Sequence, residues 1–97
     1  MDIKTKSGFK CKVNEKKMKD WRFVKALAKC DSDDESSVIE GLSFVVPFLL
    51  GEEGEDKLLN HVMDEDGVAS TTEIIREFKE ILTLMGSEIK KSQSSQE

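Results

Sequence analysis

The period of the hydrophobic pattern changes near Asn14, and this change constrains the fold more than any other feature. Before Asn14, apolar residues alternate with lysines, as in half-buried β-strands. After it, apolar residues recur every three to four positions, as in amphipathic helices. Asn14 is also a favourable helix N-cap. The sequence therefore predicts an α+β, mostly α fold, with an N-terminal β-hairpin followed by a compact bundle of three to four short helices.

The predicted hairpin takes its register from burial. A three-residue loop at 6–8, with Gly8 in the left-handed conformation, sets Thr5 opposite Phe9 and separates apolar from basic residues. A two-residue loop would mix the two faces. The expected buried face holds Ile3, Thr5, Phe9 and Cys11, and the opposite face holds Lys4, Lys10 and Lys12.

The helix after Asn14 is expected to bury one apolar stripe, with Phe23 on its flank. Its members are Met18, Trp21, Val24, Leu27 and Ala28. Trp21 is the only tryptophan of the chain and is predicted to be a core anchor.

The second predicted helix opens at a capping box, Ser32-x-x-Glu35. It should bury Val38, Leu42, Val45, Val46 and Leu49. Pro47 predicts a kink, or a stop followed by a short new turn ending near Gly51, because its ring clashes with the preceding helical turn.

A third, short helix is expected at 52–63, followed by a turn at Asp66-Gly67. It should bury Leu58, Leu59, Val62 and Met63. A further capping box, Ser70-x-x-Glu73, opens the last helix, for which Gly86 is the expected stop. That helix should bury Ile74, Ile75, Phe78, Ile81, Leu82 and Met85. The chain is thus divided into a single domain, 1–86, and a flexible polar tail, 87–97.

Charge is unevenly distributed along the 97 residues, whose net charge is −5. Residues 1–29 carry ten Lys/Arg and three acidic residues, whereas residues 30–97 carry five and seventeen. Such asymmetry marks a nucleic-acid or protein interface, or two halves that face each other within or between subunits; we favour the second interpretation. A domain this small has modest stability, so homo-oligomerisation would raise it.

Neither a membrane span nor a signal peptide is indicated, and Cys11 and Cys30 are expected to be reduced thiols of a cytoplasmic protein. No catalytic centre, metal site or cofactor is indicated. His61 has no nucleophile at a characteristic spacing. An EF-hand alignment places Asp64, Asp66 and Glu73 at ligand positions, but it puts Val62 at the first position, where a side-chain oxygen is required.

Besides a calcium-responsive module based on the EF-hand alignment, two classes of binding protein remain. A small nucleic-acid-associated regulator would use the lysines of the hairpin, although the acidity of the whole chain disfavours it. A protein-binding function is better supported, because the run Phe44–Leu50 and the flanks of the last helix provide surplus apolar surface. The residues predicted to bind a client are Phe44, Phe48, Leu49, Ile75, Phe78, Ile81 and Leu82.

The order of features resembles the small tail assembly chaperones of long-tailed, siphovirus-type phages and prophages. The resemblance lies in the hairpin Ile-x-Thr-x-x-Gly-Phe leading into the helix at 20–28, in the apolar helix ending at Leu49-Leu50-Gly51, and in the segment 58–68 before a closing amphipathic helix. The basic N-terminal third and Pro47 depart from it.

The resemblance implies a non-enzymatic protein of the host cytoplasm. It would bind the tape-measure protein and tail-tube subunits, and a frameshifted longer form would extend its C-terminal tail.

Overall fold

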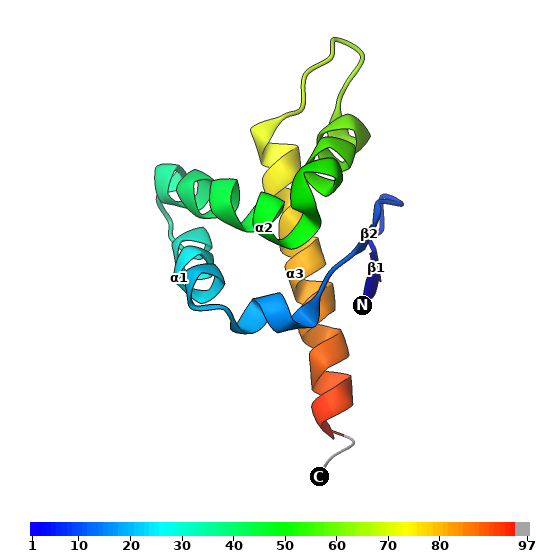
Figure 1. Cartoon of the computed structure of the whole chain (residues 1–97). Coiled ribbons are helices and arrows are strands. Elements are labelled where there is room, and N and C mark those ends of the chain that lie inside the picture. The colour runs from blue at the N-terminus through cyan, green and yellow to red at the C-terminus, as the bar shows by residue number, and fades with distance from the viewer. Residues whose placement is uncertain (95–97) are drawn as a thin grey trace.

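A computed structural model describes the backbone of residues 1–94 and the side chains of residues 1–87 (Figure 1). It confirms the predicted fold class, a two-stranded hairpin followed by helices. The elements are β1 (Asp2–Lys4), β2 (Lys10–Lys12), the 3₁₀ helix η1 (Glu15–Lys19), α1 (Trp21–Cys30), α2 (Glu35–Val62) and α3 (Thr71–Ser94). In Figure 1 the long α3 passes behind α2, and its C-terminal end projects beyond the other elements.

The hairpin has the predicted register. Ile3 pairs with Cys11, the Thr5 amide donates to the Phe9 carbonyl at 2.9 Å, and Gly8 has a φ of 98°. The left-handed conformation at Gly8 is one that a residue with a Cβ rarely adopts. Its buried face packs on the helices, while the lysines of both strands face outward.

The helix predicted after Asn14 is interrupted at Asp20. Asn14 does act as an N-cap, but it caps the 3₁₀ helix η1. Asp20 is extended, with φ −68° and ψ 133°, and its side chain caps a new helix that begins at Trp21. Because the helix restarts there, α1 buries Phe23, Ala26 and Cys30. The predicted stripe through Trp21 and Val24 is wrong, since both side chains are exposed.

Helix α2 consists of two helical limbs joined across a non-helical residue, so the predicted division into a second helix and a third helix at 52–63 is confirmed. The bend is at Gly51, with φ 77° and ψ 169°, and not at Pro47. We call residues 35–50 its first limb and residues 52–62 its second limb. The predicted buried residues of the first limb are all in the core. In the second limb Leu58 is fully buried and Val62 packs against the core, whereas Leu59, and Met63 just after the limb, are exposed, contrary to the prediction.

The start of α2 also differs from the predicted capping box. Asp34 is the N-cap residue, and Ser32 Oγ accepts a hydrogen bond from the Asp34 amide at 3.0 Å. Ser37 Oγ donates to the Asp34 carboxylate at 3.1 Å. The loop after α2 contains the predicted turn, with Gly67 at φ 79°.

Helix α3 begins at Thr71, one residue after Ser70, as predicted. It passes through Gly86 and continues to Ser94, so the predicted stop at Gly86 is wrong. Residues 95–97 of the predicted tail lie outside the described residues. The shared core draws on every long element, including the hairpin; its largest fully buried side chains are Phe23, Val45, Leu58, Phe78, Ile81 and Met85.

Candidate protein-binding surface

An apolar hollow of about 220 Å³ lies between the two limbs of α2 and the start of α3. The bend at Gly51 turns the second limb away from the first, and the first turn of α3 closes the remaining side. We call this site the α2–α3 hollow. It is lined by Ile39, Leu42, Ser43, Val46, Glu55, Leu58, Leu59, Ala69, Thr71, Ile74 and Ile75.

The rim of the hollow is open to solvent. Ile39 on the first limb is 45% exposed and Leu59 on the second limb is 37% exposed. Concave apolar surface with a few polar groups at its edge is typical of sites that bind another molecule. Here Glu55, Ser43 and Thr71 supply the polar groups.

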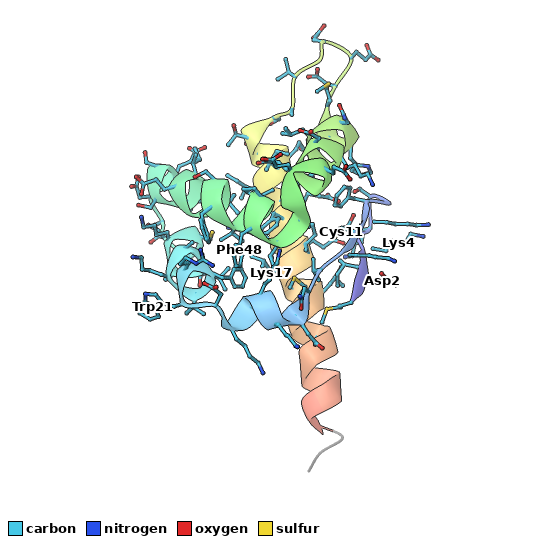
Figure 2. The ribbon with its side chains drawn as sticks, in the orientation of Figure 1. Asp2, Lys4, Cys11, Lys17, Trp21 and Phe48 are labelled. Carbon is cyan, nitrogen blue, oxygen red and sulfur yellow. The ribbon has the colours of Figure 1, made fainter. Side chains whose placement is uncertain are left out.

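A second apolar surface runs along the outer face of α1. Trp21, Val24, Lys25 and Ala28 are exposed and follow helical spacing, and we call them the α1 stripe. Trp21 is 72% exposed and Val24 is 47% exposed. Figure 2 shows Trp21 pointing away from the rest of the molecule. Apart from Lys25, these are residues that the sequence pattern assigned to the core.

Two cations, Lys17 of η1 and Arg22 at the start of α1, contact Phe48 close to the bend of α2. Lys17 Nζ donates to the Phe48 carbonyl at 2.9 Å and lies 5.3 Å from the centroid of its ring. The Arg22 guanidinium lies 5.4 Å from the same ring. Because the last carbonyls of a helical segment lack intrahelical donors, Lys17 satisfies one of them at the favourable end of the helix dipole.

The predicted client-binding residues are divided between core and surface. Ile75 lines the α2–α3 hollow. Phe44, Phe48 and Leu82 are partly buried and pack against the core. The remaining three, Leu49, Phe78 and Ile81, are fully buried core residues that a client cannot contact without opening the fold.

The rim residues Ile39 and Leu59 were missed as binding residues. For Leu59, helical periodicity predicted burial. Ile39 follows Val38 directly and carried no separate signal, because two adjacent apolar residues do not show which one faces the core.

A polar network joins the hairpin loop to both long helices. Thr5 Oγ1 donates to Glu77 Oε1, and Ser7 Oγ donates to the same oxygen at 2.6 Å. The Ser7 hydroxyl also lies 2.8 Å from His61 Nε2 on α2. On the other side of the loop, Glu80 Oε2 accepts from the Lys6 amide at 2.6 Å. We call the contacts of Thr5 and Ser7 with Glu77 the hairpin latch.

The serine, histidine and glutamate of this network do not have the arrangement of a catalytic triad. In a triad the acid bonds the second imidazole nitrogen and so orients the base. Here Glu77 is buried and accepts hydrogen bonds from the two hydroxyls, while His61 packs against Phe9 with ring centroids 5.4 Å apart. The geometry therefore satisfies a buried carboxylate and fixes the hairpin on the helices.

The lysine face of the hairpin borders a cleft of about 610 Å³ next to the second limb of α2. Its charged lining residues are Lys4, Lys10, Lys12, Lys57, Asp2 and Glu53. Cys11 also lines it, and partial burial raises the pKa of its thiol. Burial likewise raises the pKa of the Cys30 thiol, and the nearby Asp31 carboxylate adds to this shift.

In the acidic loop after α2, the carboxylate of Asp64 stabilises the turn of the loop itself. Asp64 Oδ1 accepts from the amides of Asp66 and Val68, at 2.9 and 3.0 Å. Glu73 pairs with Arg76 on the outside of α3. Within the described part of the chain, no three potential metal ligands of the His, Cys, Asp or Glu type come together.

No helix among the described residues is both long enough and apolar enough to span a bilayer. Comparisons of the chain with protein-family models, with curated proteins and with solved structures gave no match in any of the three.

Proposed function

We propose that the chain is a non-enzymatic binding protein of the tail assembly chaperone type, acting in the host cytoplasm. Its α2–α3 hollow takes up apolar side chains from a helical segment of the tape-measure protein, and tail-tube subunits are its second partner. The observation that carries the proposal is the open apolar hollow with Ile39 and Leu59 exposed at its rim. The order of the elements along the chain supports the same family.

Helix-in-groove recognition explains why such a hollow suits a helical client. An amphipathic helix presents apolar anchors at positions i, i+3, i+4 and i+7, and a groove lined by aliphatic side chains receives them. The hollow offers Ile39 and Leu59 at its rim, with Ile75 from α3, while Leu42 and Val46 form its buried floor. A long tape-measure helix exposes many such segments, and binding them keeps the client soluble.

The test is titration with a synthetic amphipathic helical peptide taken from the tape-measure protein of the same phage or prophage. Leu59→Asp and Ile39→Asp should each weaken binding at least tenfold, because each places a charge on the apolar rim. Val68→Asp is the matched control, since Val68 is exposed but does not line the hollow. Unchanged affinity in both rim variants would rule out the hollow as the client site.

The basic cleft beside the hairpin favours a second candidate function, a small nucleic-acid-associated regulator. Lys4 and Lys10 are directly paired across the strands, so their like charges repel each other until an anion lies between them. Phosphate binding weakens steeply with salt, whereas burial of an apolar client does not. Binding of single-stranded oligonucleotides that disappears between 50 and 200 mM salt, and that Lys10→Gln reduces, would favour the regulator.

A further inference from the structure

Trp21 is the most exposed large apolar side chain of the described residues, and its surroundings are strongly basic. Residues 16–29 contain six Lys/Arg and a single acidic residue, Asp20. Asp20 is already paired with Arg22 at 3.0 Å, so it neutralises little of the remaining charge. An exposed tryptophan within a field of one sign is the composition of an interface anchor.

The α2–α3 hollow has the complementary shape and charge. An apolar cavity on the order of 150 Å³ accommodates benzene, so about 220 Å³ gives room for an indole. The segment that forms it is acidic: residues 35–75 contain ten Asp/Glu, and Lys57 is the only Lys or Arg among them. Glu55 itself lines the hollow.

We propose that Trp21 of one copy of this chain inserts into the α2–α3 hollow of a second copy. Trp21 does not line the hollow of its own chain, and it points outward from α1 (Figure 2). One copy therefore contributes the anchor and the other the receiving site, which is a head-to-tail interface. Burying the indole and neutralising unlike charges stabilise the contact, and a small domain gains most from such association.

The proposed self-association does not require the proposed function. The proposed function adds one consequence, namely that a client and a second copy compete for the hollow. If a client uses the same hollow, the second copy covers the apolar surface until the client displaces it. The experiments below contain no client, so self-association and client binding stand or fall separately.

Because Trp21 is the only tryptophan, the tryptophan emission of the chain reports on the surroundings of this side chain. Raising the concentration of the full chain from about 1 μM to 1 mM should shift the emission maximum to shorter wavelength as the sedimenting mass increases. High salt should weaken the association, since exposed unlike charges are then screened. A red-shifted emission and a monomeric mass over the whole range would overturn the proposal.

Two variants test the head-to-tail arrangement. Trp21→Ala removes the anchor and keeps the hollow, while Leu59→Asp keeps the anchor and blocks the hollow. Each alone should lose self-association by roughly thirtyfold or more. Mixed together, they should form a one-to-one dimer through the single intact interface. Val68→Asp should associate like the unmodified chain.

Circular dichroism of each variant establishes that it is folded, which is expected because both side chains are substantially exposed. Persistent self-association of Leu59→Asp would overturn the hollow as the receiving site. Failure of the two folded variants to pair would overturn the head-to-tail arrangement.

Discussion

Asp20 determines how the first third of the chain meets the core. Its carboxylate accepts from the Arg22 amide at 2.8 Å, which caps α1, and pairs with the Arg22 guanidinium at 3.0 Å. Its extended backbone separates η1 from α1. Because a new helix starts after Asp20, the periodicity of the residues before Asp20 does not determine which face of α1 points to the core.

We expect Asp20→Ala to destabilise the protein by about 0.5–2 kcal/mol, through loss of the N-cap. Asp20→Asn should cost less, because asparagine caps a helix nearly as well and only the ion pair is lost. Urea unfolding of the three proteins at neutral pH measures both differences. Equal losses of stability in Asp20→Ala and Asp20→Asn would contradict the prediction that the helix cap and the ion pair contribute separately.

The difference in unfolding free energy between the unmodified chain and Asp20→Asn should depend on pH. Hydrogen bonding from the Arg22 side chain lowers the pKa of Asp20 below its ordinary value of 3.8. A lowered pKa in the folded state means that the charged form stabilises the fold above the unfolded pKa. The unfolding free energy of the unmodified chain should therefore exceed that of Asp20→Asn by a constant amount down to about pH 4. This difference should disappear as the pH falls further, through the lowered pKa of Asp20.

Trp21 shows why this part of the candidate site was not predicted from the sequence. Two sets of residues in this helix have the spacing of a buried stripe. One set is Trp21, Val24 and Ala28, and the other, on a neighbouring face, is Phe23, Ala26 and Cys30. Periodicity gives the spacing of a stripe but does not choose between two overlapping ones. The choice is made by the cap at Asp20 and by contact with α2, which is a long-range interaction.

At the scale of elements, Gly51 sets the angle between the limbs of α2 and so creates the hollow. Its φ of 77° belongs to the left-handed region, and a Cβ placed there would meet no atom within 4 Å. The cost of a side chain at this position is therefore conformational only. Pro47, by contrast, lies within the first limb without ending it.

Gly51→Ala should destabilise the protein by about 1–3 kcal/mol, since φ 77° with ψ 169° is a conformation that essentially only glycine adopts. Gly86→Ala is the matched control with the opposite sign. Gly86 lies inside α3 with open space around it, so alanine should stabilise by up to about 1 kcal/mol. Thermal unfolding measures both. Destabilisation by Gly86→Ala would contradict a helix that continues through residue 86.

Gly41 permits the close approach of α1 to the first limb of α2. A Cβ at this position would lie 2.6 Å from the Ala26 carbonyl oxygen and 2.8 Å from Cys30 Sγ. We expect Gly41→Ala to cost about 1–3 kcal/mol by overpacking, less up to about 1 kcal/mol regained in helix propensity. A variant as stable as the unmodified chain in urea unfolding would contradict this packing.

The elements predicted correctly from the sequence are those whose hydrophobic pattern allows only one face to be buried. The hairpin register follows from burial of one face, and the stripes of α2 and α3 have no competing stripe of equal strength. Predictions failed where the outcome depends on contacts between elements, or where a residue that often ends a helix adopts helical geometry instead. The direction of Leu59 depends on the bend at Gly51, and the continuation of α3 past Gly86 depends on a glycine accepting ordinary helical geometry.

At the scale of the whole molecule, the basic and acidic halves pack together, but few of their opposite charges pair within one chain. Among the described residues, Lys29 and Glu40 form the one ion pair between α1 and α2, at 3.2 Å, and both side chains are exposed. Exposed pairs of this kind contribute little to stability. The charge asymmetry is therefore largely unused inside the monomer, which leaves it available for contacts between molecules.

Cohesion of the whole molecule depends on how the hairpin is attached to the helices. Two strands of three residues are marginal by themselves, so the hairpin persists through its buried apolar face and through the hairpin latch. If the latch holds, the hairpin should open only when the entire core unfolds. The amides of Thr5 and Val13, which donate to Phe9 and Met1, should then be protected from hydrogen exchange as strongly as those of α3.

Glu77→Ala should break this coupling, because it removes the acceptor of the Ser7 and Thr5 hydroxyls. We expect a loss of about 1–3 kcal/mol in global stability. The protection of the Thr5 and Val13 amides should fall further than that of α3. Replacing both partners, as Thr5→Val with Glu77→Leu, should not restore full stability, because the buried Phe9 amide then loses its acceptor, the Thr5 hydroxyl, at 3.2 Å. If the hairpin amides of the unmodified chain exchange freely while α3 stays protected, the hairpin opens on its own, and the helices alone form the cooperative unit.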